Sequence, residues 1–366
     1  MKTAIFLGAG ASAAEGAPIQ SELFGEYFKN PEVPKASPMY ADLAQFFQSI
    51  FNINLDLPIE TIKFPTFEEA LGVLDLAENR KESLRGFSLS QPAPGVQMPS
   101  AANRIQLLRL DLILLMAKAI DDGIKIKKLP KGPHAQLIGK LRDQTLLTDT
   151  MFVSTNYDIC IDLALDNDRD YAVDFATDGE PFVPGPQATK LFKPHGSLNW
   201  LYCPVCNNVK QFGSKAVLSL PYKGREVNQC EYCKSILSPV IVPPTFYKDM
   251  TRVFLSRIWN KTEDALREVD HIIFCGYSLP DADMHIKYLL KRVQTNRQDS
   301  ESIRFTLVNH HYGDPPNGVP PKKPEVATNE RERYERFFGQ HVIDTGKSFE
   351  EFVADPKSFY DGLVQI

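Results

Sequence analysis

The sequence predicts an α/β protein whose core is a Rossmann-like, mostly parallel sheet with helices on both faces. Short apolar segments rich in Ile, Val and Phe recur along the 366 residues, and helical stretches separate most of them. The first of these segments leads directly into a glycine-rich turn, as in open α/β sheets that bind ligands. The segments expected as strands are 4–7, 151–154, 190–193, 240–242, 271–275, 303–308 and 341–343.

The spacing of apolar residues also predicts how the chain is divided. A long helix is expected before the second strand, because Ile105, Leu108, Leu112, Leu115 and Ala119 recur at helical spacing. The first two strands lie too far apart for one crossover helix, which predicts a mainly helical insertion. We therefore expect a core of residues 1–30, 135–200 and 238–366, a helical insertion at 31–134 and a small module at 201–237. Loops are expected at 91–95 and 312–324, where Pro and Gly are frequent.

Composition excludes several classes of function. The chain has 41 basic and 46 acidic residues, a net charge of −5, and no basic block that predicts a nucleic-acid surface. No apolar run reaches the roughly 20 residues that a membrane span needs. The N-terminus does not resemble a signal peptide, since its apolar segment runs at once into the glycine turn. These features predict a cytoplasmic protein without a membrane segment.

The glycine turn after the first strand predicts a phosphate site. Gly8 and Gly10 let the backbone turn tightly and approach a ligand, because neither carries a Cβ atom. A helix that begins near Ser12 would direct its free N–H groups to the same place. The alternative is a tight turn between a strand and a helix that binds no ligand.

Small polar residues and glycines also follow the other expected strands, where open α/β sheets bind their ligands. The residues of interest are Thr155, Asn156 and Asp158 after the second strand, His195 after the third, Gly276 and Ser278 after the fifth, and Asn309 after the sixth. Such a concentration predicts a ligand site along this edge. Each has a plainer explanation: Asn156 and Asp158 suit turns and helix caps, and His195 could be a structural histidine. His310 and His311, beside the proline-rich loop, are expected at the surface.

Four of the six cysteines predict a zinc site. They form two C-x-x-C pairs, Cys203 with Cys206 and Cys230 with Cys233. Each pair supplies two thiolates from one tight turn, and four sulfur ligands leave no open position for water, so the zinc would be structural. A redox dithiol or unrelated thiols are the alternatives, which the paired spacing disfavours. Cys160 and Cys275 lie in apolar stretches and are expected to be buried thiols.

Taken in order, these motifs resemble those of the sirtuins. The resemblance rests on the G-A-G-A-S turn, the T-N-Y-D sequence, the H-G pair, the four cysteines, the G-Y-S sequence and a final strand-end asparagine, and it spans residues 1–309 apart from the insertion. It implies that NAD is bound and cleaved at its nicotinamide bond. Its implied contacts are Gly8, Ala9, Gly10 and Ser12 with the pyrophosphate, Asn156 and Asp158 beside the nicotinamide and its ribose, and Gly276, Ser278 and Asn309 with phosphate and adenosine ribose. Thr155 joins the binding residues, and His195 is the implied catalytic histidine.

Departures from the protein deacylases point to a different activity. Those enzymes carry G-I-P-D-F-R after the glycine turn, whereas residues 16–21 here read G-A-P-I-Q-S and lack the acid and the arginine. The sequences around His195 and Gly276 look like the divergent bacterial sirtuin-like proteins of antiviral defence, several of which hydrolyse NAD. The resemblance therefore favours an NAD hydrolase. A deacylase and a non-catalytic NAD- or ADP-ribose-binding subunit stay as alternatives.

The chemistry of such a hydrolase assigns a role to each candidate residue. Cleavage builds positive charge on the ribose, as in glycoside hydrolysis. Asn156 is expected to position water or the nicotinamide amide, and Asp158 to orient that group or stabilise the cation. His195 is the expected general base. Because unregulated NAD loss would kill the host, control by a homo-oligomer or by a partner is expected; in related systems a similar chain works with an ATPase of the HerA type.

Overall fold

The structure is a computed structural model, and part of the chain is described. The described residues are 1–33, 35, 37–80, 82, 84, 101–124, 131–166, 171–173, 189–211, 229–235, 237–242, 253–281, 283–297, 303–309, 324–339 and 342–362. The loops expected at 91–95 and 312–324, His310, His311 and the start of segment 341–343 lie wholly or mostly outside them. The chain divides into two compact units, one of Met1–Ala17, Ile124–Pro244 and Asp249–Ile366, the other of Pro18–Gly123 and Thr245–Lys248.

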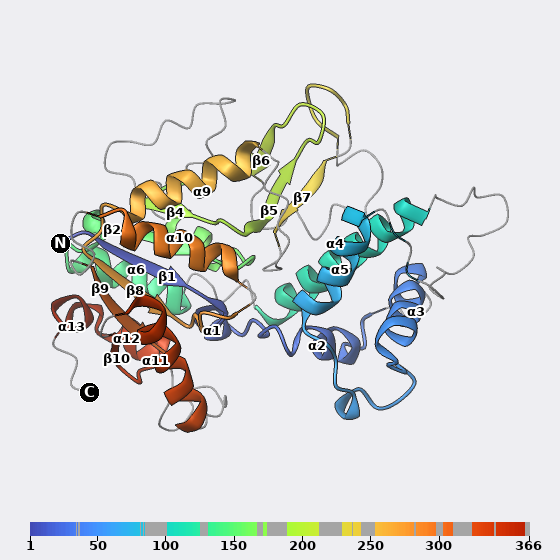
Figure 1. The fold of residues 1–366 in the computed structure, drawn as a ribbon, viewed down its shortest axis with the longest axis horizontal. Helices are drawn as coiled ribbons and strands as arrows, with labels where there is room; N and C mark the ends of the chain where they lie inside the picture. The colour runs from blue at the N-terminus through green and yellow to red at the C-terminus, as the bar shows by residue number, and fades with distance from the viewer. Residues whose placement is uncertain are drawn as a thin grey trace. The chain divides into compact units, whose positions relative to one another are not determined.

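The first unit is built on a seven-stranded sheet in which all paired strands are parallel (Figure 1). Its strands are β1 (Thr3–Leu7), β2 (Thr150–Ser154), β3 (Tyr171–Val173), β4 (Thr189–Phe192), β8 (His271–Cys275), β9 (Arg304–Val308) and β10 (Ile343–Asp344). Their order is β10-β9-β8-β1-β2-β4-β3. The chain builds outward from β1 in both directions, so the switch point lies between β1 and β8, where ligands bind in such sheets.

Helices cover both faces of this sheet because its central strands alternate between two cores. Phe6, Phe274 and Phe305 point to one face, where they pack with Trp259, Ile286 and Tyr334. Ile5, Phe152 and Ile273 point to the other, where they pack with Leu137, Ile161 and Phe352. The first face is covered by α9 (Val253–Leu266), α10 (Met284–Thr295) and α11 (Pro324–Phe338), the second by α6 (Pro133–Asp143), α7 (Cys160–Asp166), α12 (Phe349–Ala354) and α13 (Pro356–Asp361). The predicted fold class is thereby confirmed.

A small antiparallel sheet follows β4 and corrects one predicted strand. It consists of β5 (Gly196–Tyr202), β6 (Val209–Gln211) and β7 (Ser238–Ile241), in the order β6-β5-β7. Segment 240–242 was expected in the parallel sheet, but β7 pairs antiparallel with β5 instead. Val240 packs there with Trp200, Phe254 and Ile258, so its apolar character serves this smaller core. A short apolar run does not reveal which sheet it joins.

The second unit is helical in its described part. It holds α2 (Leu23–Lys29), α3 (Pro38–Phe51), the 3-10 turn η1 (Ile59–Thr61), α4 (Phe67–Arg80) and α5 (Ala101–Gly123), the last of which contains the predicted long helix. Phenylalanine rings at 24, 28, 47 and 64 form its aromatic centre, with ring centroids 4.8–5.9 Å apart. Among the described helices, none has the length and apolar character that crossing a membrane requires.

Candidate functional site

The glycine turn lies at the switch point, and its glycines are needed there for packing. A Cβ atom on Gly8 would lie 2.6 Å from the backbone oxygen of Gly276, and one on Gly276 would lie 2.3 Å from the nitrogen of Ala11. Gly10 donates its N–H to the Gly276 oxygen at 2.9 Å. The absence of side chains therefore lets the turns after β1 and β8 touch, and Gly276 adopts a positive φ of 63°. Helix α1 (Ala9–Ala13) begins at Ala9, ahead of the predicted start at Ser12.

Accessibility differs along this turn. Ala9 and Gly10 are exposed, whereas Gly8 and Ser12 are buried. The Ser12 hydroxyl is engaged inside the protein, as described below. A ligand at this edge would therefore meet the backbone of Ala9 and Gly10 before it met the Ser12 side chain.

Asn156 is fixed by its amide nitrogen at the end of β2. Its Nδ2 donates to the backbone oxygen of Gly8 at 2.8 Å and to Ser12 Oγ at 2.7 Å. Because the Gly8 oxygen can only accept, these contacts determine which side of the amide carries the nitrogen. The Asn156 Oδ1 atom is thereby held on the opposite side of the amide. The residue is partly exposed, and its amide is held in one orientation beside the glycine turn.

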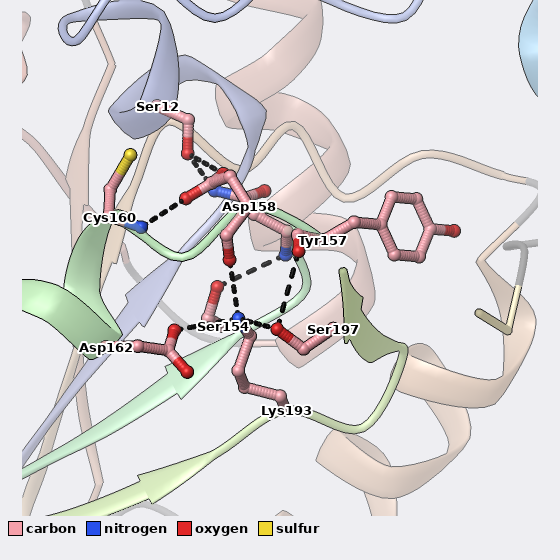
Figure 2. A network of polar contacts seen from close by, with 9 residues as sticks. Ser12, Ser154, Tyr157, Asp158, Cys160, Asp162, Lys193 and Ser197 are labelled. Atoms are coloured by element: carbon pink, nitrogen blue, oxygen red, sulfur yellow. Dashed lines mark hydrogen bonds and ion pairs between the residues drawn. The ribbon is translucent and has the colours of Figure 1, made fainter. Parts of the chain in front are cut away.

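Asp158 is buried and satisfied by protein groups (Figure 2). Its Oδ2 accepts from Ser12 Oγ at 2.5 Å and its Oδ1 from the Cys160 backbone N–H at 2.9 Å. Burial alone would raise the pKa of this carboxyl, but nearby Lys193 and the bond from Ser12 outweigh it and lower the pKa. Asp158 is therefore a carboxylate that holds Ser12, and Ser12 in turn accepts from Asn156. This geometry suits a positioning role better than contact with a substrate.

Lys193 is the main residue that the sequence analysis missed. Its ammonium group is completely buried and donates to the Asp158 backbone oxygen at 2.5 Å, to Asp162 Oδ2 at 2.8 Å and to Ser197 Oγ at 2.6 Å (Figure 2). An ammonium group has three N–H donors, and all three are used. Lys193 thus ties the loop after β2, helix α7 and the start of β5 together. The signal that could have pointed to Lys193 is its position as a charged residue at the end of the expected strand 190–193, two residues before His195.

His195 lies beside the Asn156 loop. The backbone N–H of Leu198 donates to the Tyr157 oxygen at 2.8 Å, which joins the two loops. The imidazole ring packs near Tyr157 and Trp259, with centroids 6.4 and 6.2 Å away. Its Nε2 lies 3.3 Å from Asp283 Oδ1. His195 is only 2% exposed, whereas Asn156 is partly exposed, so a substrate reaches His195 only if neighbouring side chains move.

The other predicted binding residues are placed around the same edge. Thr155 donates its hydroxyl to the Leu7 oxygen at 3.3 Å, and Ser278 is partly exposed. Asn309 is buried beside the turn after β8, where its Nδ2 donates to the Tyr277 oxygen at 3.3 Å. Its Oδ1 has no hydrogen-bond partner among the described residues. An unpaired buried acceptor is costly, and a hydroxyl donor from a ligand would satisfy it.

The four cysteines come together as the sequence predicts. Their sulfur atoms all lie within 4.8 Å of one another. Tetrahedral zinc with bonds of about 2.3 Å requires sulfurs about 3.8 Å apart, so this donor set fits the metal. The two C-x-x-C turns have the same construction: Asn207 and Lys234 adopt φ near 60°, and each donates back to the first cysteine of its pair at 2.9 Å. Hydrogen bonds from Ser235 lower the pKa of Cys233 to about 6.

The remaining cysteines also match expectation. Cys160 and Cys275 are free, buried thiols, 2% and 0% exposed. Burial raises the pKa of both well above the usual value. Neither is suited to act as a thiolate nucleophile.

Comparison with known proteins finds a family match over part of the chain. Residues 150–316 match the family described as the SIR2-like domain. No curated protein matches the chain. The chain also resembles solved structures titled "Structural Basis for the Mechanism and Regulation of Sir2 Enzymes" (13% identity, 99% of this chain and 93% of that one, TM-score 0.44) and "Sir2-p53 peptide-NAD+" (12%, 100% and 94%, 0.41). The matched segment 150–316 contains Asn156, His195, the four cysteines and Asn309, whereas the glycine turn at residues 8–12 lies outside it.

Proposed function

We propose that this protein hydrolyses NAD to nicotinamide and ADP-ribose. The observation that carries the proposal is the fixed amide of Asn156 at the end of β2, beside the glycine turn that follows β1. Asn156 is partly exposed, and its oriented Oδ1 can accept a hydrogen bond from water or from the carboxamide of nicotinamide. The SIR2-like match of residues 150–316 supports NAD as the dinucleotide.

The surrounding residues suit the rest of the dinucleotide. The exposed residue Ala9, at the first position of α1, and the partly exposed Ser278 offer N–H and O–H donors to the pyrophosphate at the edge of the sheet. The unpaired Oδ1 of Asn309 suits a ribose hydroxyl. Gly8 and Gly276 contribute by letting the two turns meet rather than by direct contact.

The reaction needs few groups from the protein. The bond between ribose C1′ and the nicotinamide nitrogen breaks, and its electron pair stays with nicotinamide. Water forms the new C1′–O bond and loses a proton, which His195 accepts. Asn156 orients the attacking water, and the Asp158 carboxylate acts through Ser12 by keeping Asn156 in place. The cysteine module would hold zinc as a structural centre, without an open coordination position for chemistry.

Hydrolysis is favoured over deacylation by the segment after the glycine turn. Residues 16–21 lack the acidic residue and the arginine of the deacylase pattern. We therefore assign the protein to NAD depletion, with bacterial anti-phage defence as its setting. A toxic reaction of this kind calls for control by self-association or by a partner such as a HerA-type ATPase.

The test is an incubation of the purified full chain with NAD, with and without an acetyl-lysine peptide, followed by chromatography of the products. We expect nicotinamide and ADP-ribose without peptide. NAD should also fall in cells that express the chain, which covers the case of a cellular activator. Asn156→Ala and His195→Ala should abolish NAD loss while circular dichroism shows a folded protein.

Other outcomes would identify the alternatives. Nicotinamide release that depends on the peptide would indicate a deacylase. Calorimetric NAD binding without any turnover, in vitro and in cells, would indicate a binding subunit. Full activity in either alanine variant would contradict the assigned residues.

A further inference from the structure

Asp283 occupies the N-cap position of α10 but does not cap the helix. Aspartate at this position usually accepts a hydrogen bond from a backbone N–H of the first turn. Here the side chain makes no such bond, although it is 99% buried. Its carboxylate must therefore be satisfied elsewhere, because an unpaired buried charge is very costly.

The two carboxylate oxygens of Asp283 face two different side chains. The Tyr277 hydroxyl donates to Oδ2 at 2.8 Å, and His195 Nε2 lies 3.3 Å from Oδ1. Tyr277 is itself held firmly, because its ring packs 4.9 Å from that of Phe6 and its backbone oxygen accepts from the Tyr334 hydroxyl at 2.6 Å. The carboxylate is thus fixed on one side by Tyr277 and directed on the other side at the imidazole.

We propose that Asp283 is a positioning residue for His195, which it holds in the tautomer with the proton on Nε2. A carboxylate can only accept, so the ring nitrogen that faces it must carry a hydrogen. The neutral imidazole then has its lone pair on Nδ1. In the proposed hydrolysis, on which the catalytic meaning of this assignment rests, Nδ1 is the atom that takes the proton from water. Contacts of this type are often long without substrate and shorten when it binds.

An asparagine at position 283 tests the assignment directly. Tyr277 would still donate to the amide oxygen, so the amide nitrogen of Asp283→Asn would face His195 Nε2. A donor at that place demands an acceptor, and the tautomer should change to Nδ1–H. The equivalent change in the Ser-His-Asp triad fixes the wrong tautomer in the same way. Asp281→Asn is the matched control, because Asp281 is 82% exposed and pairs with Lys287.

The primary measurement is ¹⁵N NMR of histidine-labelled full-length protein, with the His195 signals identified by their loss in His195→Gln. We expect an Nε2–H tautomer in the wild type and in Asp281→Asn, and an Nδ1–H tautomer in Asp283→Asn. For NAD hydrolysis we expect kcat of Asp283→Asn to fall about 100-fold or more with little change in KM. Asp281→Asn should keep the wild-type kcat.

The NMR result does not depend on turnover, so the two proposals can fail separately. An Nδ1–H tautomer in the wild type, or an unchanged tautomer in folded Asp283→Asn, would overturn the positioning role. If Asp283→Asn does not fold, the His195 tautomer of the wild-type protein still tests the positioning role. The expected tautomers in a protein that never consumes NAD would support the positioning role and contradict the proposed function.

Discussion

Two buried histidines lie at opposite ends of the same parallel sheet and have opposite surroundings. His271 is the first residue of β8, at the amino edge; its Nε2 lies 2.8 Å from Thr306 Oγ1 and its Nδ1 lies 3.0 Å from an Arg304 nitrogen. Burial and the Arg304 charge lower the pKa of His271 to about 3. His195, beyond the carboxyl end of β4, instead has the Asp283 carboxylate beside it.

The comparison shows that the neighbours, rather than the residue type, determine what a buried histidine can do. Burial and the Arg304 cation keep the His271 imidazole neutral, and Arg304 donates a hydrogen bond to its Nδ1 atom. A carboxylate beside His195 can accept a hydrogen bond from the imidazole and so orient it, as a general base requires. The amino edge of this sheet is accordingly built for stability, and the carboxyl edge carries the groups suited to chemistry. The predictions below test this division.

The largest expected effect concerns the proposed zinc site, which we place on the carboxyl side of the parallel sheet, the side of His195. Strand β5 runs from Gly196, next to His195, to Tyr202, next to Cys203, so zinc would anchor one end of the strand that follows His195. Cys206→Ser should abolish zinc binding, because structural zinc sites need all four ligands. We expect hydrogen exchange to become fast in β5 and to stay unchanged in β8. Equally fast hydrogen exchange in β5 and β8 of Cys206→Ser would contradict this prediction. So would a variant that retains one zinc ion per chain, as measured by mass spectrometry.

Lys193→Met should cost about 3–5 kcal/mol of unfolding free energy. The change leaves the Asp162 carboxylate and the Asp158 loop buried without their cation, and breaking one partner of a buried ion pair has a cost of this size. Chemical denaturation measures it. Lys287→Met is the control, since its partner Asp281 is 82% exposed and such pairs contribute at most about 1 kcal/mol. Equal costs for the two variants would show that Lys193 is not the centre of the network.

The stability contribution of His271 should decline as the pH falls. Its folded pKa of about 3 lies below the ordinary 6.5, so between these values the unfolded chain takes up a proton that the folded chain refuses. Relative to pH 7.5, the wild type should lose about 2 kcal/mol at pH 5 through this residue alone. His271→Gln lacks that loss, so the difference in unfolding free energy between the two proteins should shift by this amount. A difference that stays constant with pH would mean that the pKa of His271 in the folded state is close to its ordinary value. The variant should hydrolyse NAD normally.

Local patterns allowed much of the fold and part of the site to be predicted. Apolar runs indicated the central strands, because a parallel sheet buries both faces of each strand. The spacing of Cys203, Cys206, Cys230 and Cys233 indicated their cluster, since each pair lies within one turn. The position of Asn156 after a strand predicted its place beside the glycine turn, where its Nδ2 contacts the Gly8 oxygen and Ser12 Oγ. In each case residues close in sequence carried the signal.

Contacts between distant segments could not be predicted. Nothing near Lys193 indicates that Asp162 and Ser197 will surround it, and nothing near His271 reveals Arg304. Segment 240–242 looked like any buried strand until its pairing with β5 was known. The sequence also did not indicate that Gly8 makes room for the backbone of Gly276. All of these depend on which elements become neighbours, which apolar periodicity does not encode.

The smallest effects should come from removing one hydroxyl near each histidine. Thr306→Val deletes the partner of His271, and Tyr277→Phe deletes a donor to Asp283 while keeping the packed ring. Each should lower the unfolding free energy by about 1 kcal/mol, the usual net value of a hydrogen bond. Only Tyr277→Phe should also lower kcat for NAD, because a freer Asp283 holds His195 less firmly. If Thr306→Val impaired turnover as much, the amino edge would take part in catalysis and the two histidines would not differ as their neighbours imply.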